Sequence, residues 1–217
     1  MPKVKICGNR TSEDLDAARR ADALGFIVGT PESSRNLNLD QAVRLVQDIP
    51  PFTSSVLVTT QRSVPAQRKF VRAIKPDYLQ LHFDLESGQL ECIADSLPGG
   101  TQLIALLPVT GDERQLINKA RCLTDTSAAA ILLDTKVGGK TGGTGKVHDW
   151  RISRKIRDAV APFPVILAGG LNPANVSEAI RQVRPAAIDL ASGVEGNGEK
   201  SPEKIEAFLS EVRDCET

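Results

Sequence analysis

Hydrophobic and polar residues follow two alternating patterns along the 217-residue chain. Short apolar runs, typical of strands buried on both faces, alternate with segments whose apolar residues recur every three or four positions, as in an amphipathic helix. The pattern predicts strands at 4–6, 22–28, 54–59, 78–81, 101–107, 128–133, 165–168 and 187–190. Helices are predicted at 11–20, 39–47, 64–74, 85–95, 112–122 and 150–160, and two more begin at Pro173 and Pro202.

Side chains that can cap a helix support several of these helix starts. A polar residue at the cap accepts a hydrogen bond from the first turn, and a capping box adds the reciprocal bond. Proline is favoured at the first helical position because its missing N–H costs no hydrogen bond there. The predicted caps are Thr11 with Asp14, Asn38 with Gln41, Asn172 before Pro173, and Ser201 before Pro202.

Strands that alternate with helices predict parallel βαβ units. Eight such units favour closure into an α/β fold, the (β/α)8 TIM barrel, although 217 residues is near the short end for it. A doubly wound open sheet is the alternative, but such a sheet rarely contains eight units this regular. No composition shift, low-complexity tract or linker divides the chain, so we expect residues 1–217 to form a single barrel domain.

Composition excludes several classes of protein. Lys plus Arg and Asp plus Glu both number 27, which argues against a general nucleic-acid binder, because such a protein needs a cationic face. No apolar run is long enough to span a membrane, and the chain opens on a strand without an apolar signal region. The four cysteines form no C-x-x-C pair, and the two histidines give no zinc-ligand spacing. We therefore expect a reduced, cytoplasmic protein without a metal.

The most distinctive stretch is DTKVGGKTGGTGKVHDW, residues 134–150. It places Asp134 where a buried strand meets a glycine-rich loop, at the rim where α/β proteins place their chemistry. It is not a nucleotide P-loop, because Asp134 stands where the first glycine of that motif belongs, nor a Rossmann turn, because His148 stands at the last glycine. The alternative is a solvated surface loop with Asp134 as a cap.

Further candidates lie at the same end of the predicted strands. Taken singly, each has an ordinary structural explanation: Cys7 as a small buried residue, His82 as a loop residue with satisfied hydrogen bonds, and Arg35 as a surface charge. Their occurrence together at one rim favours a functional site. The groups at these strand ends are Cys7, Arg35, His82, Asp134, Gly169 with Gly170, and Ser192 with Gly193.

This arrangement favours a small phosphorylated substrate. Loops after the seventh and eighth strands of a barrel commonly hold a phosphate on backbone N–H groups. The reacting carbons would then lie between Cys7 and Asp134, which stand on strands that are not neighbours. A base and an acid on two sides of a substrate suit proton relocation, as in an aldose–ketose isomerisation, and that chemistry needs no cofactor.

The same residues resemble the phosphoribosylanthranilate isomerase family of tryptophan biosynthesis. The KICG start and the GGTG…DW loop are specific when they occur together. The matching segments are KICG at 5–8, ALGF at 23–26, SR at 34–35, QLH at 80–82, LD at 133–134, GGTG at 142–145, DW at 149–150, LAGGLNP at 167–173 and SGVE at 192–195.

The resemblance implies an isomerase that performs an Amadori rearrangement of N-(5′-phosphoribosyl)anthranilate to 1-(2-carboxyphenylamino)-1-deoxyribulose 5-phosphate. It implies Asp134 as the general acid on the ribose ring oxygen, Cys7 as the general base at C2′, and Arg35 as the partner of the anthranilate carboxylate. It also implies a cytoplasmic monomer or homodimer. The remaining substrate-binding candidates are His82, Gly143, Gly145, Gly169, Gly170, Ser192 and Gly193.

These roles require shifted pKa values. Asp134 must begin protonated, so its pKa is expected to be raised by burial and a nearby anion. Cys7 must act as a thiolate, so a cation such as Lys5 or Arg35, or an adjacent dipole, is expected to favour its ionised form.

Two positions depart from the family pattern. The family usually has a proline between the serine and the arginine, but Ser34 precedes Arg35 directly here. It often has glycine after the histidine, where this chain has Phe83, a side chain that either narrows the mouth or packs outward. Both departures bear on recognition of the anthranilate.

Two other functions remain open at this point. One is a related phosphate-binding barrel acting on another sugar phosphate, such as the aminoimidazole isomerase of histidine synthesis. That family relies on two aspartates, one of them at the position of Cys7. The other is a non-catalytic paralogue that binds phosphorylated ligands, which would have no need of the pair Cys7 and Asp134.

Overall fold

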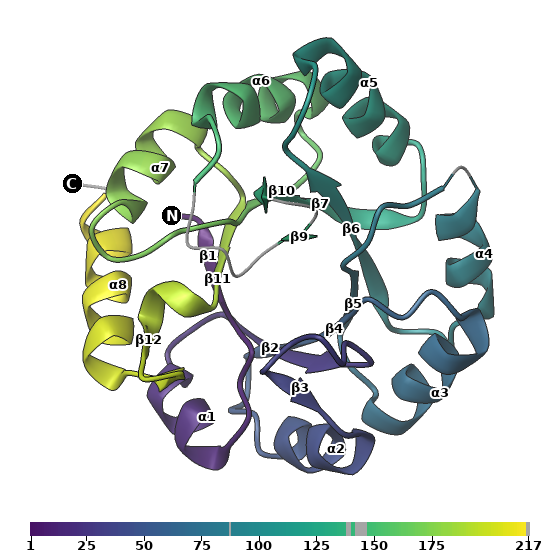
Figure 1. Ribbon diagram of the computed structural model, residues 1–217, viewed down its shortest axis with the longest axis vertical. Helices are drawn as coiled ribbons and strands as arrows, with labels where there is room; N and C mark the ends of the chain where they lie inside the picture. The colour runs from purple at the N-terminus through teal and green to yellow at the C-terminus, as the bar shows by residue number, and fades with distance from the viewer. Residues whose placement is uncertain (87, 138–139, 142–146, 216–217) are drawn as a thin grey trace.

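The strands form a closed parallel barrel (Figure 1). The computed structural model describes residues 1–86, 88–137, 140–141 and 147–215. Within them, the hydrogen-bonded order runs β1, β11, β10, β7, β6, β5, β4, β2, and pairing of β1 with β2 closes the ring. The predicted (β/α)8 barrel is therefore confirmed. Its strands are β1 (Lys3–Cys7), β2 (Ala23–Val28), β4 (Ser54–Thr59), β5 (Tyr78–Leu81), β6 (Gln102–Pro108), β7 (Ala128–Asp134), β10 (Val165–Leu167) and β11 (Ala187–Leu190).

A ring of helices surrounds the barrel (Figure 1). Each follows one barrel strand, as in successive βαβ units. The helices are α1 (Ser12–Ala18), α2 (Leu39–Gln47), α3 (Val64–Ile74), α4 (Gln89–Ser96), α5 (Glu113–Thr124), α6 (Trp150–Val160), α7 (Val176–Val183) and α8 (Pro202–Asp214).

Two apolar layers hold the barrel together. The larger lies between strands and helices and includes Ile6, Leu24 and Phe26. The smaller fills the barrel interior. Because alternate strand residues face opposite sides, both layers draw on the same strands, which explains why the strands read as continuous apolar runs. The interior layer consists of Cys7, Val56, Val58, Ile104, Leu106, Ala130, Leu132, Ile166 and Ala168.

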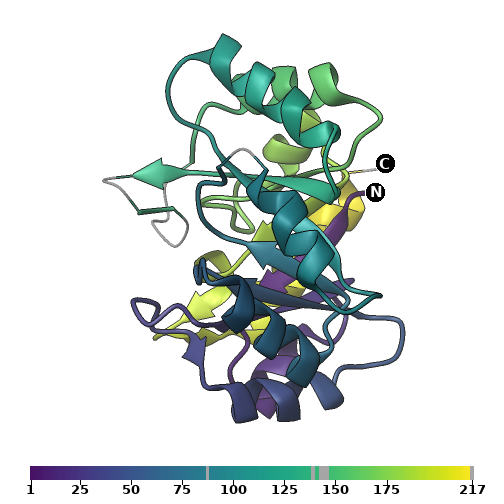
Figure 2. The ribbon, with the colours of Figure 1, turned by 90° about the vertical axis from the view of Figure 1, so that its right-hand side faces the viewer.

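Several short elements were not predicted from the sequence. The pairs β8–β9 and β12–β13 are antiparallel hairpins, and β3 pairs with β2. Figure 2 shows β8–β9 on the opposite side of the barrel from the two chain termini. Two-residue strands have no periodicity that a sequence pattern can reveal. These elements are β3 (Asn36–Leu37), β8 (Lys136–Val137), β9 (Lys140–Thr141), η1 (Ser192–Val194), β12 (Glu195–Gly196) and β13 (Glu199–Lys200).

Two predicted caps are confirmed and one is half formed. Asn38 and Gln41 make both bonds of a capping box, and Ser201 caps α8 through the backbone N–H of its third residue. Thr11 accepts from the N–H of Asp14 at 3.2 Å. The expected reciprocal bond is wrong, because the Asp14 carboxylate accepts from the N–H of Arg10 at 2.7 Å instead.

The predicted start of α7 is also wrong. The helix begins at Val176 with Asn175 at the N-cap, not at Pro173 after Asn172. The Asn172 side chain accepts from the N–H of Ala174 and so forms a turn. Asn175 accepts from the N–H of Asn172 and donates to the carbonyl of Gly170, both at 2.9 Å. The turn therefore ties the glycine loop after β10 to the helix.

Removing a side chain from the interior layer will destabilise the protein. Leu132 is fully buried there, so Leu132→Ala is expected to lower the free energy of unfolding by about 2–5 kcal/mol. The measurement is urea denaturation followed by circular dichroism. Phe52 is fully exposed, so Phe52→Ala serves as the control and should change stability by about 0.5 kcal/mol at most. Equal stability of the two variants would contradict a packed interior.

Candidate active site

A cavity of about 650 Å³ opens at the carboxyl ends of the barrel strands. It falls in the size range of small-molecule sites. Gly143 and Gly145 lie outside the described residues. The cavity is lined by every other sequence-predicted candidate, namely Cys7, Arg35, His82, Asp134, Gly169, Gly170, Ser192 and Gly193.

Asp134 is a buried acid at the end of β7. Its Oδ1 accepts from the N–H of Thr135 at 2.6 Å, and His82 Nε2 lies 3.8 Å from its Oδ2. Burial raises the pKa of Asp134 to about 7; the Thr135 hydrogen bond opposes this rise and the charge of Asp189 adds to it. The raised pKa and the nearby anion both agree with the sequence-based expectation.

Gly169 contributes to the burial of this acid. Its φ of +89° is a conformation that residues with a side chain rarely adopt. A Cβ at this position would lie 2.3 Å from Thr135 Oγ1 and 2.8 Å from Asp134 Oδ1. Only glycine therefore lets the loop after β10 lie directly against the carboxyl group.

Cys7 is a buried thiol at the end of β1. Burial raises its pKa, and the charge of Asp189 adds to the rise, while the cations Lys5 and Lys200 lower it by less. The expectation that Lys5 favours the thiolate is right in direction, but desolvation outweighs it. The free protein therefore holds Cys7 as a thiol, and the thiolate expected from the sequence is not its resting form.

Lys5 and Asp189 form an ion pair inside the barrel. The two residues are register partners on β1 and β11, and Lys5 Nζ lies 2.8 Å from Asp189 Oδ1 with both side chains buried. Charges this deep must be paired to remain ionised. Lys5 was expected near Cys7, whereas Asp189 was not predicted. The available signal was one charged residue inside each of two otherwise apolar strands, VKIC and AIDL.

Arg35 belongs to a second charge network at the rim. Its Nε and Nη2 donate to the Glu195 carboxylate at 2.7 and 2.5 Å. Lys200 Nζ, also buried, donates to the same carboxylate at 2.9 Å. Burial alone would raise the pKa of Glu195, but these hydrogen bonds lower it to about 2. No role was predicted for Glu195 or Lys200. Of the two cations expected to favour the thiolate, Lys5 acts on Cys7, whereas Arg35 is bound to the Glu195 carboxylate.

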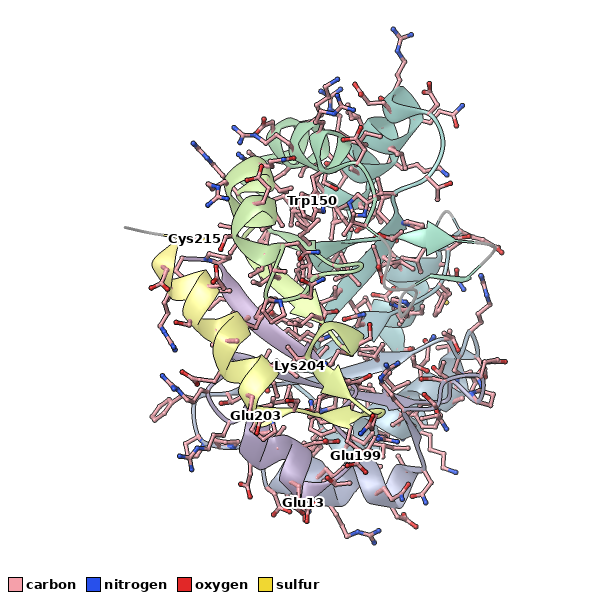
Figure 3. The ribbon with its side chains drawn as sticks, turned by 60° about the vertical axis from the view of Figure 1, so that its left-hand side comes forward. Glu13, Trp150, Glu199, Glu203, Lys204 and Cys215 are labelled. Atoms are coloured by element: carbon pink, nitrogen blue, oxygen red, sulfur yellow. The ribbon has the colours of Figure 1, made fainter. Side chains whose placement is uncertain are left out.

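The hairpin that carries Glu195 is fastened to α8. Lys204 lies in the first turn of that helix, beside the β12–β13 hairpin (Figure 3). Its Nζ donates to the backbone carbonyl of Glu195 at 2.7 Å. On the other side, Gly8 leaves room for the Arg35 side chain, because a Cβ on residue 8 would lie 2.4 Å from Arg35 Cδ. The position of Arg35 is thus determined from both sides.

His82 is oriented by Gln80, a buried residue two positions earlier on β5. The Gln80 amide nitrogen lies 3.2 Å from His82 Nδ1. The other ring nitrogen, Nε2, is the one nearer Asp134. Within the described part of the chain, Gln80 Oε1 is buried without a hydrogen-bond partner.

His148 anchors the end of the glycine-rich loop. Its Nδ1 lies 2.9 Å from Thr135 Oγ1, and its Nε2 lies 2.6 Å from Ser153 Oγ on α6. Burial lowers the pKa of His148 to about 4, so the ring is neutral near pH 7. A chain of hydrogen bonds thus joins the neighbour of the acid to α6. This structural role of His148 was not predicted from the sequence.

The described residues contain no group of three or more His, Cys, Asp or Glu side chains placed to hold a metal ion. Among the helices described here, none is long and apolar enough to cross a membrane.

Comparison with known proteins identifies the family. The family model described as N-(5′-phosphoribosyl)anthranilate (PRA) isomerase matches residues 4–211. The chain belongs to the PRA isomerase family. The N-(5′-phosphoribosyl)anthranilate isomerase of Methanothrix thermoacetophila is 39% identical over 218 residues, covering 100% of both chains. The resemblance inferred from the sequence is confirmed.

Solved PRA isomerases share the fold. The enzyme from Thermococcus kodakaraensis is similar with a TM-score of 0.82 and 34% identity, covering 99% of this chain and 100% of that one. A PRA isomerase in complex with reduced 1-(o-carboxyphenylamino)-1-deoxyribulose 5-phosphate has a TM-score of 0.79 and 29% identity over the same shares. Membership of this family disfavours the histidine-pathway alternative, which also lacks a thiol at the position of Cys7.

The raised pKa of Asp134 makes the protein less stable at higher pH. The unfolded carboxyl ionises near pH 3.9, whereas the folded one ionises at about 7. The protonated Asp134 side chain therefore contributes its full stability below about pH 4. Relative to Asp134→Asn, the native protein loses this contribution as the pH rises to about 7. Urea denaturation at pH 4, 6 and 8 should show the variant gaining up to about 4 kcal/mol over the native protein across this range. A pH-independent difference would contradict the raised pKa.

Proposed function

We propose that this chain catalyses the Amadori rearrangement of N-(5′-phosphoribosyl)anthranilate to 1-(2-carboxyphenylamino)-1-deoxyribulose 5-phosphate in tryptophan biosynthesis. Family membership supports the reaction. The observation that carries the mechanism is one cavity that contains a carboxyl group with a pKa raised to about 7, a buried thiol and two glycine turns. No cofactor is required for this proton relocation.

The loops after β10 and β11 are the proposed phosphate site. Gly169 and Gly170 follow β10, and Ser192 and Gly193 follow β11, the neighbouring strand. The two loops are in close contact, because a Cβ on Gly193 would lie 1.8 Å from the carbonyl oxygen of Leu171. Backbone N–H groups at such turns can approach a phosphate closely.

In the proposed first step, Asp134 protonates the ribose ring oxygen. Its raised pKa keeps the proton available near pH 7. As the C1′–O bond breaks, the anilino nitrogen supplies an electron pair and a cationic iminium forms. The new carboxylate remains hydrogen-bonded to the N–H of Thr135, and the His82 ring lies nearby. The Thr135 N–H stabilises the charge that Asp134 acquires.

In the proposed second step, the Cys7 thiolate removes the C2′ proton. The electron pair of the C–H bond neutralises the iminium and gives an enolamine, which tautomerises to the ketone. Burial holds Cys7 as a thiol in the free protein, so the thiol must first release its proton to solvent through the open cavity. The iminium cation beside it adds to the favourable charge of Lys5 and lowers the cost of forming the thiolate.

Arg35 is the proposed partner of the anthranilate carboxylate. A guanidinium has five N–H donors, and the Glu195 pair uses one edge of the group. The remaining donors are available for a second carboxylate in the same plane. We also propose that the chain forms a single domain that acts in the cytoplasm as a monomer or homodimer. A solved relative from Thermotoga maritima is described as dimeric and was also obtained as monomers.

Turnover of freshly made substrate tests the reaction. Loss of anthranilate fluorescence is followed for the native protein, Asp134→Asn and Cys7→Ser. Each variant should lose about 10²–10⁴-fold in rate, the usual contribution of a positioned acid or base. Cys92 is exposed, so Cys92→Ser should keep native activity. A native protein that binds phosphorylated ligand without turnover would favour another sugar phosphate or a non-catalytic binder.

The pH dependence of kcat/KM tests the assignment of acid and base. The active form needs protonated Asp134 and ionised Cys7. Because the thiol pKa lies above that of the acid, this form is a minor one. Its fraction rises with pH to about 7, then stays level, and falls only above the ordinary thiol pKa of about 8.5. In Asp134→Asn the break near pH 7 should disappear; its persistence would assign that break to another group.

A further inference from the structure

Two residues at the rim lie opposite the proposed phosphate site. In the closed order of strands, β4 is four positions from β10, and β5 is four positions from β11. Arg62 follows β4 and Phe83 follows β5, and both line the cavity. A long substrate whose phosphate lies against β10 and β11 therefore directs its other end, the anthranilate, toward this pair.

Phe83 holds Arg62 at the cavity mouth. The Phe83 ring is 7% exposed and packs in the layer between strands and helices, so its position is fixed while one surface reaches the cavity. The Arg62 guanidinium carbon lies 4.8 Å from the centre of this ring. Such a cation–π contact orients a planar guanidinium that would otherwise move freely. Phe83 thus packs in the layer between strands and helices and also lines the cavity mouth, so it combines the two possibilities considered for it.

Arg62 differs in its partner from Arg35, the other arginine that lines the cavity, and from the buried lysines Lys5 and Lys200. Arg35 and Lys200 donate to Glu195, and Lys5 pairs with Asp189, so the charge of each is offset by a carboxylate. Arg62 instead rests on an aromatic ring, which orients it without supplying a formal negative charge. The carboxylates of Glu32 and Asp84 also line the cavity. Because like charges repel, their presence favours a binding mode in which the substrate carboxylate lies at the Arg62 guanidinium and away from the rest of the rim.

We propose that Arg62, positioned by Phe83, is a second contact for the carboxylate of the anthranilate ring, beside Arg35. Arg35 and Arg62 together select substrates that carry a carboxylate on the aromatic ring. This inference rests on the proposed isomerase function and deepens it. It also gives Phe83 a role at a position where the family often has glycine: it forms the surface that orients the arginine.

Ligand binding with and without the carboxylate tests the inference. The two probes are reduced 1-(o-carboxyphenylamino)-1-deoxyribulose 5-phosphate and its counterpart with an unsubstituted phenyl ring, each titrated calorimetrically. Arg62→Ala should weaken binding of the carboxylate ligand about tenfold, as expected for a lost charge-assisted hydrogen bond. Binding of the phenyl counterpart should not change. The matched control is Arg68→Ala, an exposed residue on α3 that does not line this cavity.

A second variant tests the role of Phe83. Phe83→Leu keeps an apolar side chain in the core but removes the ring, so it should weaken the carboxylate ligand alone, by about threefold. In the Arg62→Ala background it should have no further effect, because Phe83 acts through Arg62. An equal, independent loss in both backgrounds would overturn this positioning role.

The outcomes separate this inference from the isomerase function itself. If the native protein neither turns over the substrate nor binds the carboxylate ligand, the proposed function fails. If the native protein does both and Arg62→Ala binds the carboxylate ligand equally well, only the role of Arg62 is overturned. The same conclusion follows if Arg62→Ala weakens both probes equally, because the effect would then not depend on the carboxylate.

Discussion

The ion pair between Lys5 and Asp189 determines the electrostatics of the barrel mouth. Removing two charges from water costs several kcal/mol for each ion, and only close pairing offsets this cost. The β1–β11 register provides that pairing, because the two residues are direct partners on neighbouring strands. Both charges act on both proposed reacting groups: Lys5 favours ionised Cys7 and Asp134, and Asp189 disfavours it. Their opposite effects leave burial as the decisive influence on both groups.

Burial raises the pKa of Cys7 and of Asp134, but only one of these shifts suits the resting protein directly. A protonated Asp134 is ready to act as an acid, whereas Cys7 must first lose its proton. The proposed order of events resolves this difference, because the acid step itself creates the cation that favours the thiolate. In the second network, Arg35 and Lys200 share Glu195, whose pKa is lowered to about 2, and the proposed role of this network is recognition. The cavity thus separates groups that exchange protons from groups that hold charge.

The sequence was sufficient to predict the barrel, because strands buried on both faces leave apolar runs and parallel strands bring their carboxyl ends to one rim. That reasoning placed Cys7 and Asp134 in one cavity. It could not reveal Asp189 as a partner of Lys5, since strand register depends on closure of the whole sheet. Nor could it place the start of α7, because the Asn172 side chain accepts from the N–H of Ala174 in a turn and the helix begins only at Val176. The protonation of Cys7 depends on a balance between burial and nearby charges, and that balance can be judged only from the folded structure.

The bonds of His148 have a consequence for how this protein tolerates change. Thr135 and Ser153 contact the His148 ring from both sides. The residue just before the segment 136–147 is therefore held against the residue just after it. Insertions, deletions or a transplanted sequence between these two anchors need not displace Asp134. The position of Asp134 therefore depends on these two anchors rather than on the length of the segment that they enclose.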